Sequence, residues 1–138
     1  MDNRCEGVVE CTALVLAESC TEVDDRLTLF GVLDELRLPE SGESSFVVYA
    51  KFEGCEHATP DKERRARILI TDEEGAVLME SAEYTVWLDG TEEPVTIVAV
   101  FDLPEDFGDG ESVLWVEAVF DDETLSQTVV PLHDRYSV

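Results

Sequence analysis

The residues best suited to chemistry are Cys55 and His57, which are separated by a single glutamate. In an extended chain, positions i and i+2 project to the same side, so this thiolate and imidazole could bind one metal ion. Cys20 and Cys5 would add sulfur ligands and complete a tetrahedral zinc site. The spacing of the cysteines matches no standard zinc knuckle, so free thiols are the alternative. Cys55, His57, Cys20 and Cys5 therefore form a candidate zinc site, and no other cofactor is expected.

The fourth cysteine, Cys11, lies within a continuous apolar-rich run from Val8 to Ala17. Its position beside Ala13 and Val15 predicts a small buried thiol, although it could also serve as a further soft ligand. A continuous apolar run without strict alternation is typical of a strand that is covered on both faces. We therefore expect this segment to be buried on two sides.

Carboxylates offer a second kind of metal site. Five of them crowd the loop that follows one expected strand: Asp102, Glu105, Asp106, Asp109 and Glu111. Two more, Asp24-Asp25, share a turn. Calcium takes six to eight oxygen ligands, which such loops can supply. The EF-hand pattern is absent and carboxylates are abundant throughout, so loose condensation of cations is the competing interpretation.

Enzyme signatures are thin. The sequence has no Gly-x-Ser-x-Gly motif, no phosphate-binding glycine loop and no dinucleotide fingerprint. His57 and His133 are the candidate bases near neutral pH. A nucleophile pair of Cys55 and His57 would need a third orienting group, and paired carboxylates could act on glycosides. We expect the chain not to be an enzyme, with a small hydrolase as an alternative.

Net charge is the strongest compositional signal. Asp and Glu total 33 against 9 Lys and Arg, which gives a formal net charge of -24 at pH 7. Such a chain repels nucleic-acid backbones and anionic lipid, so neither is expected as a partner. Dense carboxylates and a scarcity of lysine, with Lys51 and Lys62 alone, are typical of adaptation to high salt. We expect a halophilic source; an ordinary acidic protein is the alternative.

The start of the chain bears on its location. Residues 1–6 have neither the basic nor the apolar part of a signal peptide. No stretch approaches the roughly 18 apolar residues of a membrane helix. We expect a cytoplasmic protein, or part of an assembly formed in the cytoplasm, in which the cysteines are reduced thiols or metal ligands.

Alternation with a period of two residues runs through most of the chain and predicts β-strands. The expected strands are 8–17, 27–33, 44–53, 65–71, 76–80, 84–88, 94–101, 113–120 and 124–132. Acidic turns separate several of them, although residues 73–83 could instead contain a helical turn. Strands of this length and spacing predict an all-β fold. It is expected to be a single-domain antiparallel β-sandwich of about eight strands, immunoglobulin-like or related, over 1–138, with 1–7 and 133–138 as tails.

The alternation also assigns faces. Phe46, Val48, Ala50 and Phe52 should point inward from one strand, as should Ala66, Ile68 and Ile70 from another. Leu27, Leu29, Gly31 and Leu33 should share a face of the second strand. The basic cluster 64–67 is expected to pair with carboxylates of neighbouring strands, or to dock an acidic copy of the chain.

Two tryptophans have outward parity. Trp87 and Trp115 lie between apolar neighbours that should face the core, so both indoles are expected on outer faces. Exposed aromatic side chains often mark protein contacts. The alternative is that a loop buries them. Trp87 and Trp115 are therefore candidate interaction residues.

The strand Leu27-Thr28-Leu29-Phe30-Gly31-Val32-Leu33-Asp34 and the closing segment support a resemblance. The closing segment has Gly108-Asp109-Gly110 and then a hairpin that ends in Val130-Pro131-Leu132. Over residues 13–132 the chain resembles a family of small prokaryotic proteins known only as a domain of unknown function. The chain departs from it by having Asp121-Asp122-Glu123 where Asp-Gly is usual, and Ser126 where glycine is common. The resemblance implies a β-sandwich and no catalytic residues.

These observations favour a non-catalytic protein-interaction or assembly module that binds another protein or copies of itself. A zinc- or calcium-binding accessory domain and a small hydrolase are the alternatives.

The charge generates a prediction about stability. Repulsion between carboxylates destabilises the compact state when it is unscreened, and at about 1 M salt the Debye length falls to about 3 Å. We expect the melting temperature to be higher in molar KCl than in dilute buffer. An equal or higher midpoint in dilute buffer would contradict salt adaptation.

Overall fold

The computed structural model describes residues 9–39, 42–54, 63–87, 94–104, 107 and 113–133. Within them the chain forms strands throughout and no helix. The strands are β1 (Val9–Val23), β2 (Arg26–Val32), β3 (Leu36–Arg37), β4 (Glu43–Gly54), β5 (Glu63–Thr71), β6 (Val77–Glu80), β7 (Tyr84–Trp87), β8 (Val95–Pro104), β9 (Val113–Phe120) and β10 (Glu123–His133). No described segment is a helix of the length and apolarity that crossing a membrane would require.

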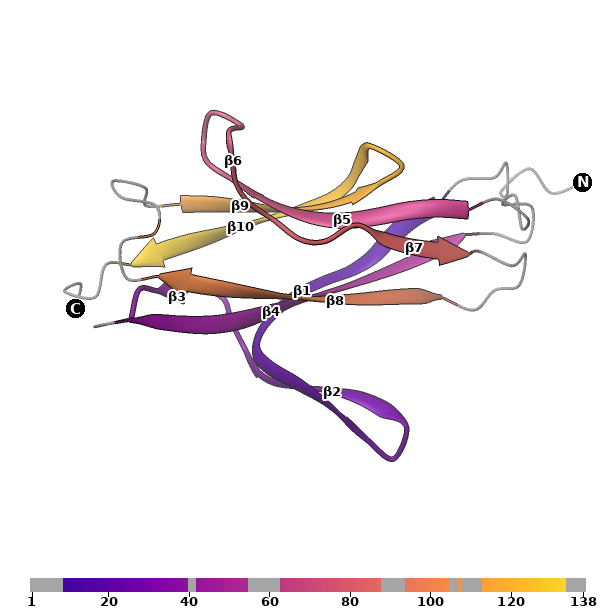
Figure 1. The fold of residues 1–138 in the computed structure, drawn as a ribbon, viewed down its shortest axis with the longest axis horizontal. Coiled ribbons are helices and arrows are strands. Elements are labelled where there is room, and N and C mark those ends of the chain that lie inside the picture. The colour runs from indigo at the N-terminus through magenta and orange to yellow at the C-terminus, as the bar shows by residue number, and fades with distance from the viewer. Residues whose placement is uncertain are drawn as a thin grey trace, which may run out of the picture.

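The strands form two sheets that pack face to face. Sheet A has the order β2-β1-β4-β8, and sheet B has the order β3-β10-β9-β5-β6, with β7 also paired to β5. Every pairing is antiparallel except that of β3 with β10. The two sheets appear as separate layers in Figure 1. The expected all-β sandwich is confirmed, with ten strands in the described part of the chain where about eight were expected.

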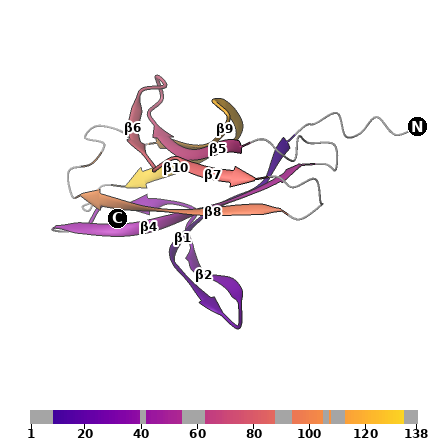
Figure 2. The ribbon, with the colours of Figure 1, turned by 45° about the vertical axis from the view of Figure 1, so that its right-hand side comes forward.

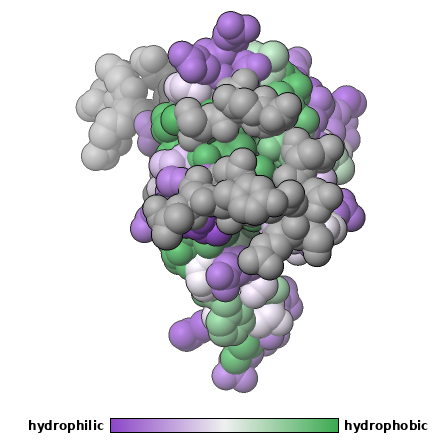
Figure 3. Space-filling model, turned by 90° about the vertical axis from the view of Figure 1, so that its left-hand side faces the viewer, coloured by the Kyte–Doolittle hydropathy of each residue, from purple (hydrophilic) through white to green (hydrophobic). Residues whose placement is uncertain are grey.

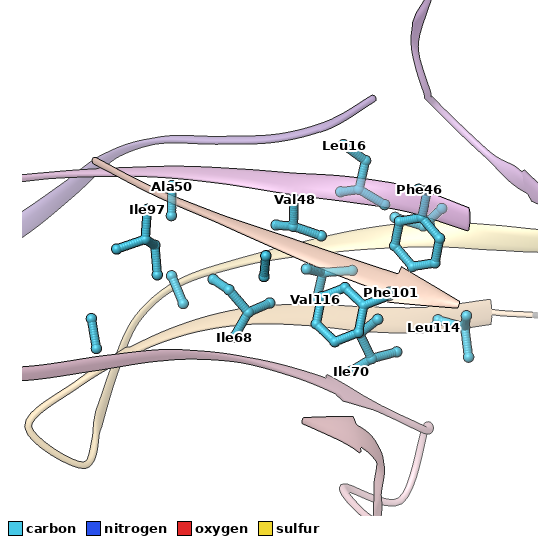
Figure 4. Packing of buried hydrophobic residues seen from close by; sticks show 14 of the residues in the cluster. Leu16, Phe46, Val48, Ala50, Ile68, Ile70, Ile97, Phe101, Leu114 and Val116 are labelled. Atoms are coloured by element: carbon cyan, nitrogen blue, oxygen red, sulfur yellow. The ribbon is translucent and has the colours of Figure 1, made fainter. Parts of the chain in front are cut away.

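The core lies between the inward faces of the two sheets (Figure 4). Phe46, Val48, Ala50 and Phe52 of β4 are at most 2% exposed, as the alternation predicts. The inward residues 66, 68 and 70 of β5 are fully buried. These side chains meet the inward residues of β8 and β9, and Phe46 stacks on Phe101 with ring centroids 5.5 Å apart. Burial of this apolar surface is the main force that holds the two sheets together.

An aromatic contact joins the sheets at one end of the core. Phe52 of sheet A meets Phe120 of sheet B with ring centroids 5.2 Å apart. The guanidinium of Arg64 lies 5.0 Å from the centroid of the Phe120 ring and forms an ion pair with Asp121. Arg64 therefore covers a core aromatic ring while its charge is neutralised.

Acidic residues close two of the hairpins. Asp24 and Asp25 join β1 to β2, and Asp121 and Asp122 join β9 to β10, with positive φ at all four residues. Two-residue hairpin loops of type I′ need positive φ at both central residues, and Asp tolerates that conformation better than most residues. In the segment 73–83, a tight turn stabilised by Asp72 leads directly into β6, so the helical alternative is wrong.

The β1–β2 hairpin leaves the sandwich. Beyond Ala17, strand β1 pairs with β2 alone, and the two strands project from the side of sheet A that faces away from sheet B (Figures 1 and 2). Leu27 and Leu29 were expected to share one face of a strand with Leu33. Leu33 packs against the core, whereas Leu27 and Leu29 do not, because their part of β2 lies off the sandwich.

The two Asp-Asp turns give a matched test of what anchors the sandwich. Oδ1 of Asp121 accepts a hydrogen bond from the Arg65 backbone N–H at 3.0 Å, and Asp121 also forms an ion pair with Arg64. Asp24 has a similar φ but lies in the projecting hairpin. We expect Asp121→Ala to lower the free energy of unfolding by about 2 kcal/mol. Asp24→Ala should cost less, about 1 kcal/mol at most, because it loses only the turn preference. Equal losses in urea titrations of the two variants would show that the arginine contacts contribute nothing.

Candidate interaction surface

The structure separates two of the predicted metal ligands and does not describe the others. Cys5, Cys55 and His57 lie outside the described residues. Cys20 is in the projecting hairpin opposite Leu29, and Cys11 is toward the other end of β1. The described residues contain no group of three or more His, Cys, Asp or Glu that could hold a metal ion. The zinc site stays a prediction, because Cys5, Cys55 and His57 are not among the described residues.

Cys11 behaves as a structural thiol. It is half-buried against the core, and its Sγ donates a hydrogen bond to the Ala13 carbonyl oxygen at 3.2 Å. Burial raises the pKa of the Cys11 thiol above its usual value. The thiol is therefore protonated at neutral pH, which makes it a poor nucleophile. The expectation of a small buried thiol fits this environment.

The carboxylates considered as calcium ligands have other positions or are not described. Asp102 lies on β8 with its side chain exposed, and the other four members of that loop fall outside the described residues. Asp24 and Asp25 are the central residues of a hairpin turn, where their backbone conformation explains the residue type.

The basic cluster on β5 pairs as expected with carboxylates of its neighbours. Arg65 contacts Glu83 at 3.0 Å, and Arg67 contacts Glu80 at 2.8 Å. Arg67 also lies 3.6 Å from Asp122, in the turn between β9 and β10. These ion pairs link β5 to the neighbouring segments and neutralise the charges of both arginines.

His133 holds the short strand β3 in place. It is the last residue of β10, although the sequence suggested that it begins a tail. Its Nε2 lies 2.8 Å from Oε2 of Glu35, and its backbone pairs with Arg37 of β3. The contact between His133 and Glu35 lies beside the parallel pairing of β10 with β3, which indicates a structural role for His133.

Trp115 lies on the outer face of sheet B. It alternates with the fully buried Leu114 and Val116 and is itself half-buried, as its parity predicts. Val129 stands beside it on β10 and is 52% exposed. The same face carries Glu117, which accepts hydrogen bonds from two threonine hydroxyls. Trp87 pairs with Glu63 through β7, but its side chain is not among those described.

A larger apolar surface covers the outer face of sheet A. We call it the neutral face, because no Asp or Glu belongs to it. It consists of Ala13, Val15, Ala17, Ser19, Thr21 and Val23 of β1, Arg26, Thr28, Phe30 and Val32 of β2, Val47, Tyr49 and Lys51 of β4, and Thr96, Val98 and Val100 of β8. These residues stand in register across the four strands, and their chain neighbours Leu16, Val48 and Ala99 point into the core.

The neutral face exposes apolar side chains on β8 and on the hairpin, whereas Ala17 and Val47 near its centre are buried. Val100 is 67% exposed, Val32 is 63% exposed, and Phe30 and Val23 are each 49% exposed. Hydrophobic residues also lie on the surface of the projecting hairpin, at the bottom of Figure 3. Scattered apolar residues are normal on protein surfaces, but a contiguous set across four strands marks a contact site.

The charges around this face are arranged unevenly. Asp and Glu make up 33 of 138 residues, and none lies among the residues that define the face. Carboxylates instead lie at its margins, such as Glu53 and Asp102. The charged residues of the face are Arg26 and Lys51, and neither forms an ion pair with any residue that the structure describes. The face is therefore slightly positive on a strongly negative molecule.

Sequence reasoning missed the neutral face, although one signal pointed to it. The apolar run from Val8 to Ala17 predicts a strand that is covered on both faces. In the structure one side of β1 packs toward sheet B, while the other side carries the half-buried Ala13 and Val15 and the fully buried Ala17.

Comparisons with known proteins show the fold alone. No family model matches the chain, and no curated protein matches it. An alkylpurine DNA glycosylase from Pseudomonas fluorescens, solved bound to DNA with an abasic site analog, aligns with 91% of this chain at a TM-score of 0.56 and 10% identity. A β-glucosidase from Listeria innocua aligns with 91% at a TM-score of 0.51 and 12% identity.

These similarities involve parts of larger proteins. The alignments cover 30% of the glycosylase chain and 16% of the glucosidase chain, so this chain spans less than a third of either. An immunoglobulin-like protein from Pseudomonas aeruginosa aligns over 91% of this chain and 97% of its own, at a TM-score of 0.48 and 11% identity.

Proposed function

We propose that this chain is a non-catalytic protein-interaction or assembly module from a salt-adapted organism, and that it contacts proteins through the neutral face. The single observation that carries the proposal is a contiguous apolar surface without carboxylates on a chain of net charge -24.

The distribution of charge supports contact at this face. Two surfaces that associate must lose water, and an unpaired buried carboxylate opposes that step strongly. Carboxylates are abundant in this chain, whereas the neutral face offers Val, Tyr and Phe side chains. Protein interfaces are typically depleted of Asp, Glu and Lys at their centres and enriched in aromatic residues. The neutral face has that composition, with Tyr49 and Phe30 as its aromatic residues.

The partner is a protein rather than a nucleic acid or a membrane. A net charge of -24 repels the phosphates of nucleic acid and of anionic lipid. The glycosylase with a similar fold is bound to DNA in its structure, but a likeness at 10% identity carries no binding property over to this chain. Arg26 and Lys51 are too few to offset the surrounding carboxylates against a polyanion.

The environments of the described candidate residues support a non-catalytic role. Burial raises the pKa of the Cys11 thiol, which makes it a poor nucleophile. His133 is held by Glu35, and the arginines of β5 are paired with carboxylates. Each of these candidates therefore has a structural role, which supports a binding function in preference to a hydrolase.

Two matched substitutions test which outer face binds the partner. Val100→Asp places a carboxylate in the neutral face, and Val129→Asp makes the same change beside Trp115 on sheet B. Both valines are more than half exposed, so both variants should stay folded. We expect Val100→Asp to remove proteins that co-purify with the tagged chain from a native high-salt lysate, and Val129→Asp to retain them.

The opposite pattern would move the interaction surface to the face that carries Trp115. Retention of every co-purifying protein by both folded variants would overturn the proposal. Thermal melts of each variant establish that the fold is intact.

A further inference from the structure

We propose that the occupant of the neutral face is a second copy of this chain, with the β1–β2 hairpin of each copy lying against β4 and β8 of the other. This inference rests on the proposed function and names its partner.

The distribution of charge on this chain favours a partner that is not basic at the neutral face. A basic protein would bind most favourably to the carboxylate-rich surfaces, which cover most of this chain. The face lacks carboxylates, and its Arg26 and Lys51 form no ion pair with a residue that the structure describes, so it can accept an acidic partner. A second copy, with its net charge of -24, is such a partner, and two copies can bring the central parts of this face together without burying a carboxylate.

Each end of the neutral face carries charges of both signs, Asp24 and Asp25 with Arg26 at one end and Lys51 with Glu53 at the other, and unlike charges can pair across a symmetric contact. Asp24 and Asp25 form the tip of the projecting hairpin, and Lys51 lies at the far end of the face on β4. In a twofold dimer each patch contacts the same patch of the other copy, so residue i meets j and j meets i. Overlaying the face on its copy in opposite directions brings each hairpin tip to the other copy's Lys51.

The hairpin needs a cover that the single chain does not supply. Its strands extend past the sandwich, and β2 pairs with β1 and with no other strand in the described part of the chain. A two-stranded hairpin alone is marginally stable in water. Phe30 and Val32 are nevertheless 49% and 63% exposed on it. The hairpin projects on the outer side of sheet A (Figures 1 and 2), on the same side as Val100 of β8, which is 67% exposed.

The contact should be weak and favoured by salt. A standard interface involves about 20–30 residues on each side, and the neutral face is somewhat smaller. The net charges of two copies oppose association in dilute buffer, and this long-range repulsion is largely screened at molar salt. We therefore expect a monomer in dilute buffer and a dimer in concentrated KCl.

Sedimentation velocity of the purified chain tests the inference directly. At protein concentrations up to about 0.5 mM we expect a monomer in 0.1 M KCl and a dimer in 3 M KCl. Val100→Asp on β8 and Phe30→Asp on the hairpin should each raise the dissociation constant at least about tenfold. Val129→Asp, on the outer face of sheet B, should leave it unchanged.

A charge cycle tests the contact between the hairpin tip and Lys51. Asp24→Asn with Asp25→Gly removes both tip carboxylates and keeps a favourable turn sequence. In the wild-type background this pair of changes should weaken the dimer. In a Lys51→Glu background it should strengthen the dimer, because it removes repulsion. The same direction of change in both backgrounds would overturn this arrangement.

Different results would overturn this inference and the proposed function. A purified chain that stays monomeric in 3 M KCl overturns the second copy as partner, while loss of co-purifying proteins in Val100→Asp would still support a protein contact at this face. A dimer that is disrupted by Val129→Asp and not by Val100→Asp also overturns the inference. Because Phe30→Asp could disorder the hairpin, Val100→Asp on the sandwich itself keeps the test decisive.

Discussion

Mutual repulsion between carboxylates is the constraint on which the rest of this structure depends. A chain with a net charge of -24 must keep its acidic groups apart and in water, so they cannot enter the core or any contact surface without cost. The core accordingly consists of apolar side chains from the inward faces of two sheets. The same constraint suggests a contact role for the neutral face, a second apolar surface that lies on the outside of sheet A.

The acidic residues that are ordered in the fold have specific structural tasks. Asp121 closes a hairpin, binds the Arg65 amide and pairs with Arg64, which in turn lies over Phe120 at the junction of the sheets. Asp72 accepts backbone hydrogen bonds that shape the turn before β6. Carboxylates at these positions are satisfied by cations or by amides, so part of the negative charge stabilises turns. Other described carboxylates, such as Glu22 and Asp102, are exposed to solvent, where salt screens them.

Local patterns predicted much of the fold, because side chains of a strand point alternately to its two faces and apolar residues therefore recur at every second position. The inward positions of β4, such as Phe46 and Phe52, and the acidic turn after Phe120 followed from the sequence. The short strand β3 did not, because two residues show no period. The projecting hairpin was also missed, since alternation in Leu27 and Leu29 shows the pleat but not what covers it. The neutral face depends on pairing of four strands that are distant in sequence, which no local pattern contains.

Amide hydrogen exchange of the purified chain in 3 M KCl, at a dilute and at a concentrated protein solution, tests the central claim most directly. If the neutral face is the contact surface, the concentrated sample should gain protection in the hairpin around Phe30 and along β8 around Val100, and β10 around Val129 should stay unchanged. Protection gained at β9 and β10 instead, or no difference between the two concentrations, would contradict the account.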